Sequence, residues 1–167
     1  NKKFKGLTLK LENDRAFMFF DKNKKKIYDL KNNDNFVVNT SDARGIWVGQ
    51  KRYEGKLNIF IGDNDISVVN ILGIENYLSS VVGSEMPSKW PMEALKAQAI
   101  ASRTYALKQK GNSLFDIDST QRNQVYNGLE SRTHKTTKAV RSTRSLVLTY
   151  KNKLINAVFH SSSAGMT

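Results

Sequence analysis

The stretch GSEMPSKWPMEALKAQAIASRTYAL, residues 83–107, joins a short break to a long run of good helix formers. Pro91 suits the first turn of a helix, where its missing N–H removes no hydrogen bond, and Gly111 suits a helix end. The stretch therefore predicts a helix over about 91–110. One acidic side chain, Glu85, lies in the break, two residues before Pro87.

The residues before this stretch also have helical spacing. Apolar side chains recur at i, i+3, i+4, i+7 and i+8, namely at Ile74, Tyr77, Leu78, Val81 and Val82. The pattern predicts a helix over about 74–82, with Glu75 in its first turn, where the helix dipole favours an acidic residue. Gly83 is expected to end this helix. Glu85 is then expected just beyond it, in the connection between two helices.

The first 71 residues are strand-like. Short runs rich in β-branched and aromatic residues, such as 6–12 and 56–62, are separated by clusters of Asn, Asp, Lys and Gly. This spacing predicts a small antiparallel sheet or a barrel-like lobe. Toward the C-terminus we expect a helix over about 131–143 and a β-hairpin that turns at Lys151–Asn152.

These elements predict an α+β protein that forms one domain, residues 1–167. Its β-rich part is expected to cover 1–71, and the part that carries Glu85 is expected to cover 72–167. The polar sequence at the end of the chain reads as interrupted, so we expect the domain to be cut short at the C-terminus.

Composition limits the functions that fit. The 167 residues carry a net charge of +12 and no cysteine, which excludes disulfides, thiolate metal sites and a cysteine nucleophile. No apolar run approaches the roughly 20 residues of a membrane span. The chain opens on Asn1, so we expect a signal or anchor segment outside it to export the protein.

The positive charge is unevenly distributed. After Glu130 there is no acidic residue, whereas basic residues continue: Arg132, Lys135, Lys138, Arg141, Arg144, Lys151 and Lys153. Such a surface favours an anionic partner, although an ordinary lysine-rich solvated surface explains it equally well.

Glu85 is the candidate for acid–base chemistry. A general acid must be protonated near neutral pH, which requires a carboxyl pKa above the usual value of about 4.3, and apolar surroundings provide this. Met86 and Trp90 supply apolar neighbours, as around a glutamate that protonates a glycosidic oxygen. The alternative is structural: Glu85 caps the helix at Pro91 or pairs with a nearby lysine.

Other catalytic arrangements do not fit the sequence. A Gly-rich phosphate loop, HExxH and GxSxG are all absent. With two histidines, His134 and His160, and no cysteine, a structural zinc site is not expected. His160 and Ser161 are adjacent, and adjacent residues on a strand point to opposite faces, so they make a poor Ser–His pair.

The sequence VVNILGIENYLSSVVGSEMPSKWPMEALKAQAIASRTYAL, residues 68–107, resembles the signature of the SpoIID/LytB domain family of sporulation stage II D proteins and amidase enhancers. The resemblance continues in QVYNG (124–128), AVRSTRSLVLTY (139–150) and NAVFHSSSAGMT (156–167). It implies a peptidoglycan lytic transglycosylase with Glu85, in the Ser-Glu-Met-Pro motif, as the catalytic acid. One carboxyl group suffices for that reaction, because the 6-hydroxyl of the sugar replaces water.

The resemblance also implies a set of glycan-binding residues: Gln124, Tyr126, His160, Ser161, Ser162, Ser163 and Thr167. Some members hold zinc through Cys and His in the loop before the Gln-Val-Tyr motif. Residues 118–126, DSTQRNQVY, contain neither, so no metal and no other cofactor is expected. The family favours glycine where this chain has Ser145.

Three functions stay open at this point. The first is an enzyme that cleaves the MurNAc–GlcNAc strand and leaves 1,6-anhydro-MurNAc ends. The second is a non-catalytic, glycan-binding enhancer of an N-acetylmuramoyl-L-alanine amidase. The third, a nucleic-acid binder, is disfavoured because the aromatic residues follow strand patterns rather than alternating with the basic ones. The expected partners are peptidoglycan glycan strands and a cell-wall amidase, in the periplasm or cell wall.

Overall fold

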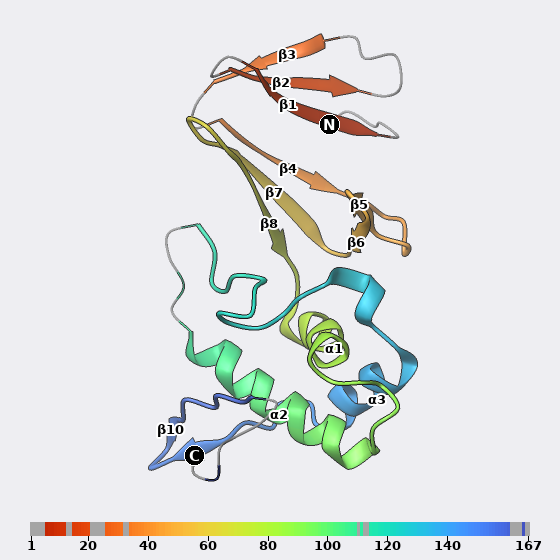
Figure 1. Cartoon of the computed structure of the whole chain (residues 1–167), viewed down its shortest axis with the longest axis vertical. Helices are drawn as coiled ribbons and strands as arrows, with labels where there is room; N and C mark the ends of the chain where they lie inside the picture. Colours follow the sequence, from red (N-terminus) through yellow and green to blue (C-terminus); the bar gives the residue numbers. More distant parts are fainter. Residues whose placement is uncertain are drawn as a thin grey trace. The chain divides into compact units, whose positions relative to one another are not determined.

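The structure, a computed structural model, describes residues 6–12, 15–20, 26–31, 34–109, 111, 114–160 and 165. Its helices and antiparallel strands confirm the α+β prediction. The chain forms two compact units (Figure 1). We call residues 1–39 and 56–71 the sheet unit, and residues 40–55 and 72–167 the helical unit.

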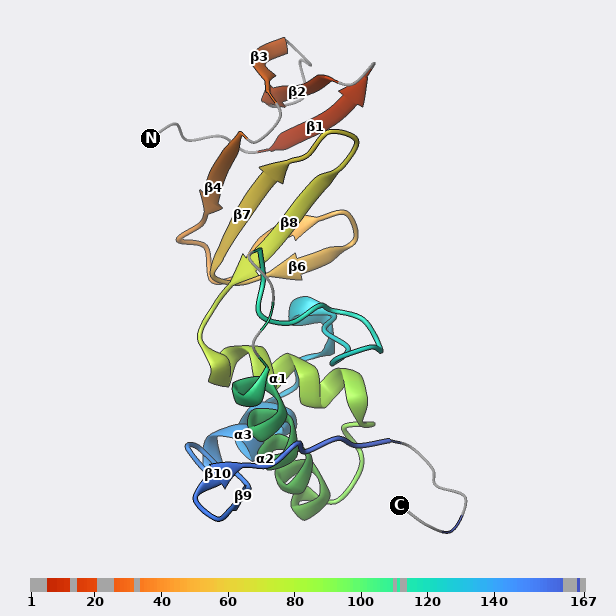
Figure 2. The same cartoon turned by 90° about the vertical axis from the view of Figure 1, so that its left-hand side faces the viewer.

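The sheet unit contains two antiparallel sheets, of order β1–β2–β3 and β4–β7–β8. Their strands are β1 (Leu7–Glu12), β2 (Arg15–Phe20), β3 (Lys26–Leu30), β4 (Asn35–Asn39), β7 (Lys56–Ile61) and β8 (Ile66–Ile71). Alternate residues of the central strand β7 are buried, at Leu57, Ile59 and Ile61, as expected for a strand with one face in a core. Figure 2 shows β4, β7 and β8 side by side. Both sheets stay open among the described strands, so the small antiparallel sheet was the correct alternative and the barrel-like lobe was not.

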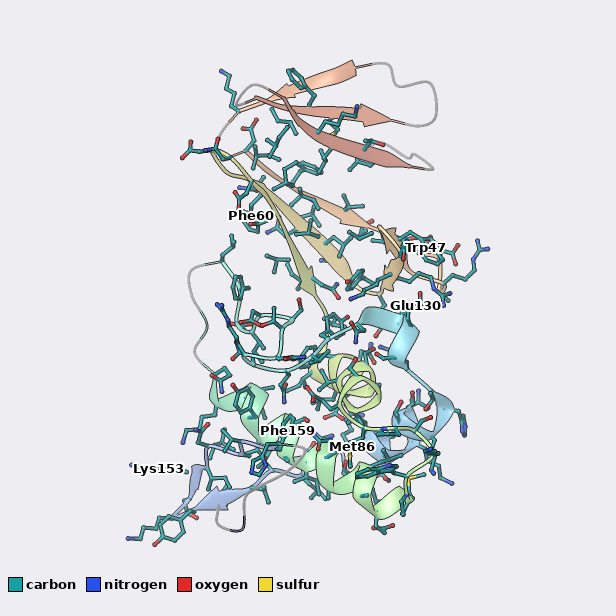
Figure 3. The ribbon with its side chains drawn as sticks, in the orientation of Figure 1. Trp47, Phe60, Met86, Glu130, Lys153 and Phe159 are labelled. Carbon is teal, nitrogen blue, oxygen red and sulfur yellow. The ribbon has the colours of Figure 1, made fainter. Side chains whose placement is uncertain are left out.

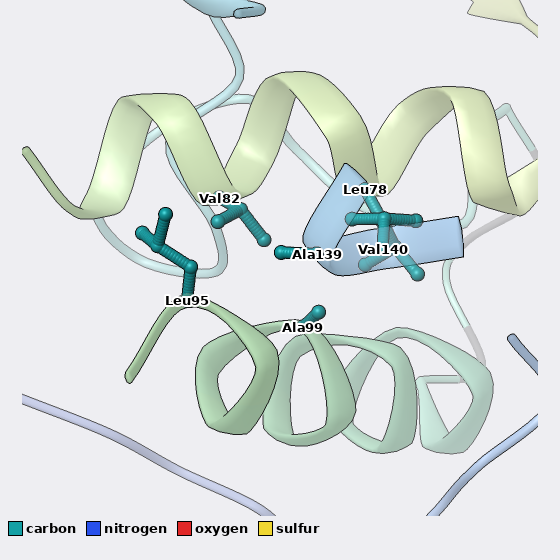
Figure 4. Close-up of a cluster of buried hydrophobic side chains, with 6 residues drawn as sticks. All are labelled: Leu78, Val82, Leu95, Ala99, Ala139 and Val140. Carbon is teal, nitrogen blue, oxygen red and sulfur yellow. The ribbon is translucent and has the colours of Figure 1, made fainter. Parts of the chain in front are cut away.

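The helical unit combines helices with two short hairpins. Its elements are β5 (Ile46–Val48), β6 (Lys51–Tyr53), α1 (Ile74–Glu85), α2 (Met92–Lys108), the 3₁₀ helix η1 (Gly128–Ser131), α3 (His134–Ser142), β9 (Thr149–Tyr150) and β10 (Lys153–Leu154). The core lies where α1, α2 and α3 meet, and it is formed by Leu78, Val82, Leu95, Ala99, Ala139 and Val140 (Figure 4). Small residues on α2 and α3 let the three helices approach one another closely.

The predicted end of α1 at Gly83 is wrong, because the helix continues through Glu85. Gly83 serves a packing role instead. A Cβ atom at this position would overlap the carbonyl oxygen of Ser131, which follows 48 residues later in η1. The Ser131 hydroxyl also donates to the Ser80 carbonyl of α1 over 2.8 Å, so η1 lies directly on this helix. Glycine is needed here because another segment of backbone lies against the helix.

We predict that Gly83→Ala lowers the free energy of unfolding by about 1–3 kcal/mol, although alanine is the better helix former. The added methyl group must push η1 away from α1. Chemical denaturation measures the change. Gly73→Ala is the matched control, because a Cβ atom there meets nothing within 4 Å. Equal effects of the two substitutions would contradict the packing role.

The C-terminal half differs from its prediction in detail. The helix expected over 131–143 begins later, at His134, because Thr133 and Thr136 form a capping box there, and Ser131 belongs to η1 instead. The C-terminal hairpin is confirmed, with Lys151 and Asn152 at φ 49° and 60° in its turn. Ser145, where the resemblance implied glycine, has φ 64°, a conformation that glycine adopts at lower cost.

Candidate active site

Glu85 is the last residue of α1 and is half-buried. Its Oε1 accepts a hydrogen bond of 2.7 Å from the backbone N–H of Val125. Oε2 accepts no hydrogen bond from any residue that the structure describes. Neither structural alternative applies, since neither a described residue in the first turn of α2 nor a described lysine donates to Glu85. Among the described residues, the carboxyl group is therefore held through one oxygen.

The surroundings of Glu85 differ from those of the other glutamates in the helical unit. Each of the others forms an ion pair with a basic side chain: Glu54 with Arg132 (2.6 Å), Glu75 with Arg103 (2.8 Å), Glu93 with Lys96 (2.8 Å) and Glu130 with Arg52 (2.7 Å). Glu85 has a neutral backbone amide in that place. No basic side chain among the described residues therefore occupies the carboxyl group of Glu85.

The segment that contacts Glu85, residues 124–127, follows α1 through three hydrogen bonds. We call it the QVYN segment. The Tyr77 hydroxyl donates to Gln124 Oε1 (3.1 Å), the Val125 N–H donates to Glu85, and the Asn127 amide donates to Ser84 Oγ (3.3 Å). Tyr77 and Glu85 are eight residues apart and so share a helix face. The motif GSEMP and the motif QVYN are thus in contact, although Glu85 and Val125 lie 40 residues apart.

Gln124 is completely buried. Its Nε2 donates to the carbonyl of Ser102 on α2 over 3.1 Å, while its Oε1 accepts from Tyr77 on α1. Both ends of the amide therefore bind protein groups and connect the two helices. This arrangement holds the neighbouring residue, Val125, where its N–H meets Glu85.

Tyr126 is also buried, and its ring packs between Tyr53 (5.8 Å between centroids) and Tyr77 (5.2 Å). Burial raises the pKa of Tyr126, and Arg132 opposes this. Burial, with smaller contributions from Tyr126 and Glu85, raises the pKa of Tyr77. The Tyr77 hydroxyl is the donor to Gln124.

The remaining candidates lie in the C-terminal tail. His160 is exposed, and the residue before it, Phe159, packs its ring edge-on against Tyr105 at 6.5 Å. Ser161, Ser162, Ser163 and Thr167 lie outside the described residues, so their part in a site stays a prediction, as does that of His160.

The sequence interpretation missed a partly buried ion pair between α1 and α2. Arg103 is 1% exposed, and its guanidinium makes two bonds to the Glu75 carboxylate (2.9 and 2.8 Å). It also donates to the carbonyls of Leu146 (3.1 Å) and Val140 (3.2 Å). The signal was present, since Arg103 follows Leu95 and Ala99 at helical spacing and therefore lies on the buried face of α2. Glu75 thus does more than complement the helix dipole.

We predict that Gln124→Leu lowers the free energy of unfolding by about 1–3 kcal/mol, because it leaves the Tyr77 hydroxyl and the Ser102 carbonyl without partners. Denaturant unfolding measures the loss. Gln98→Leu is the matched control, since Gln98 Nε2 bonds only within its own helix, to Ser102 Oγ (3.0 Å), and is partly exposed. A Gln124 variant as stable as the control variant would show that the connection contributes little.

Two further findings concern metal ligands and membrane-spanning helices. In the part of the chain that the structure describes, no three His, Asp or Glu side chains are grouped as metal ligands. None of its described helices combines the length and apolar character needed to cross a bilayer.

Comparison with known proteins matches the chain to a family. The family model described as stage II sporulation protein, SpoIID, matches residues 62–150, which include Glu85, Gln124 and Tyr126. An uncharacterized protein of Brachyspira hyodysenteriae is 42% identical over 139 residues, or 80% of this chain and 37% of that protein.

Two relatives carry functional names. An amidase enhancer of Bacillus subtilis is 42% identical over 90 residues, covering 54% of this chain and 12% of the enhancer. Stage II sporulation protein D of Bacillus subtilis is 40% identical over 119 residues, covering 60% of this chain and 34% of that protein. The chain therefore spans between 12% and 37% of the length of these relatives.

Proposed function

The chain belongs to the SpoIID family of stage II sporulation proteins, and from this premise we propose that it is a peptidoglycan lytic transglycosylase. Its substrate is the β-1,4-linked glycan strand of GlcNAc and MurNAc. The reaction cleaves the MurNAc–GlcNAc bond and leaves a 1,6-anhydro-MurNAc end. We place the protein outside the cytoplasm, where this polymer is found.

One observation carries the proposal. Among the described residues, Glu85 has no basic partner of the kind that each other glutamate of the helical unit has, and it is held instead by a backbone N–H through one oxygen. This supports a carboxyl group that is held in one place while a basic side chain does not compete with a ligand for it. The half-buried position shields it in part from water, which strengthens its interactions with a bound sugar.

The proposed mechanism uses Glu85 twice. The carboxylic acid first donates its proton to the glycosidic oxygen, and the bond from that oxygen to C1 of MurNAc breaks as positive charge develops on the sugar. The carboxylate then accepts the proton of the MurNAc 6-hydroxyl, whose oxygen bonds to C1 and closes the anhydro ring. The first proton stays on the 4-hydroxyl of the released GlcNAc, the proton of the 6-hydroxyl restores the carboxylic acid, and no water is consumed. The Val125 N–H keeps the carboxyl group in one orientation through both steps.

A second function is favoured by a specific observation, the likeness to a relative named amidase enhancer. In that case the protein binds wall glycan and stimulates an N-acetylmuramoyl-L-alanine amidase without cleaving the strand itself. The two functions differ in what purified walls release. The enzyme releases soluble glycan fragments when no amidase is present, whereas the enhancer increases release only when an amidase is added.

We predict that binding to purified cell walls weakens as salt rises. Lys138, Arg141, Arg144, Lys151 and Lys153 are exposed, and the segment that carries them has no acidic residue. Exposed charges are screened beyond about 8 Å at physiological ionic strength. Co-sedimentation with walls at increasing salt measures the effect. Binding that does not change with salt would indicate that stacking and hydrogen bonds dominate instead.

A further inference from the structure

The β5–β6 hairpin presents a tryptophan that the proposed reaction does not use. Trp47 is 63% exposed, and its strand neighbour across the hairpin is Arg52. The Arg52 guanidinium lies over the indole ring, 5.2 Å from its centroid. Arg52 covers one face of the indole, so the exposed surface of Trp47 is its opposite face and its edges. Figure 3 shows Trp47 and Glu130 at the same end of the helical unit.

The arginine that lies over this ring is held by further contacts. Arg52 makes two bonds to the Glu130 carboxylate, of 2.7 and 3.1 Å, and Glu130 belongs to η1. Gly128 has φ 66°, and a Cβ atom there would overlap the Arg52 carbonyl oxygen, so the hairpin lies close against the start of η1. The Arg52 side chain beside Trp47 is therefore already ordered in the folded protein. A ligand that binds to Trp47 does not have to order this side chain, which lowers the entropy cost of binding.

The hairpin is also fastened to the segment that holds Glu85. The Lys51 ammonium donates to Asn127 Oδ1 over 2.8 Å, and Asn127 in turn donates to Ser84, the residue before Glu85. Trp47, the QVYN segment and Glu85 are thus parts of one connected structure within the helical unit.

The chemistry around Trp47 fits a sugar better than a protein partner. The cores of protein interfaces combine several apolar residues, whereas Trp47 is a single ring with Lys51 and Arg52 close by on the same hairpin. A flat aromatic face matches the C–H face of a pyranose ring, and polar side chains at its border match the hydroxyl and N-acetyl groups.

We propose that Trp47 is a glycan subsite, distinct from the bond-cleaving site, that stacks on a pyranose ring of the same GlcNAc–MurNAc strand whose cleavage we assign to Glu85. The inference rests on the proposed function for the identity of its ligand. In this role the β5–β6 hairpin holds a long glycan strand. Substitution of Trp47 should therefore weaken the binding of long strands and leave the chemical step unchanged.

Binding is measured with peptide-free GlcNAc–MurNAc strands of defined length, in a Glu85→Gln background so that the strands are not cleaved. Trp47→Ala should raise the dissociation constant of long strands about tenfold, as truncation of a well-placed tryptophan often does. Trp47→Leu should behave like the alanine variant, because it keeps an apolar side chain but not the flat ring. Trp47→Tyr should retain most of the affinity.

Tyr150 provides the matched control, since it is 68% exposed on the β9–β10 hairpin with the Lys151 ammonium 5.4 Å from its ring centroid. Tyr150→Ala should leave the affinity unchanged. Parent-like binding of Trp47→Ala, or an equal loss in both variants, would overturn the proposal.

The proposed function is tested separately by cleavage with Glu85 intact. If Trp47→Ala weakens binding but the parent does not cleave the strands, the proposed enzyme is refuted and the subsite is retained. If the parent cleaves the strands but Trp47→Ala does not weaken binding, the subsite is refuted and the enzyme is retained.

Discussion

Glu85→Gln should lower the rate of glycan cleavage by about 10²–10⁴-fold or more, while the fold stays intact. The glutamine amide keeps the shape of the side chain, and its carbonyl oxygen can still accept the Val125 N–H bond that Oε1 accepts in the parent. It has no transferable proton at neutral pH. The rate of anhydro-end formation per folded molecule measures the effect, and thermal unfolding checks that the variant is folded.

Glu93→Gln makes the same chemical change at an exposed glutamate, one that pairs with Lys96 in the first turn of α2. It should cleave like the parent. If the Glu85 variant also cleaves like the parent, another residue is the acid. If it unfolds while the Glu93 variant does not, Glu85 is structural.

Arg103→Met should lower the free energy of unfolding by about 3–5 kcal/mol. The substitution leaves the Glu75 carboxylate without its partner, and it also removes the donor to two backbone carbonyls on the C-terminal side of α3. Methionine fills much of the same space, so the loss comes from the polar network rather than from a cavity. Equilibrium denaturation gives the value.

A double-mutant cycle separates the ion pair from the carbonyl bonds. Glu75→Gln removes the opposite charge. The double variant with Arg103→Met should lose less free energy of unfolding than the two single variants lose together. Additive losses would show that Arg103 and Glu75 do not act as a pair. A small loss in the Arg103 variant would contradict the structural role of the network altogether.

Local patterns predicted the elements of this fold well. The spacing of Ile74, Leu78 and Val82 identified α1, and the run after Pro91 identified α2. The error at Gly83 has a physical cause outside the local sequence. Glycine usually marks a helix end, but here it admits the Ser131 carbonyl, and nothing near residue 83 reveals a contact with a segment 48 residues away.

The candidate site was predictable only where its signal is local in the sequence. The break before Pro91 and the family resemblance singled out Glu85, because both are readable within a short stretch. The Val125 amide that fixes it is 40 residues away, and the arginines that pair with Glu54 and Glu130 are 78 residues from them. Sequence spacing could not show which glutamates are neutralised and which one is left without a basic partner.

The most direct test of the central proposal is mass spectrometry of glycan ends. Purified peptide-free GlcNAc–MurNAc strands are incubated with the protein alone, and the ends of the products are identified. Cleavage with Glu85 as both acid and base predicts new 1,6-anhydro-MurNAc ends, each lighter than a hydrolysed end by one water, and none with Glu85→Gln. New reducing ends in their place, or strands that stay uncut by a folded and glycan-binding protein, would contradict it.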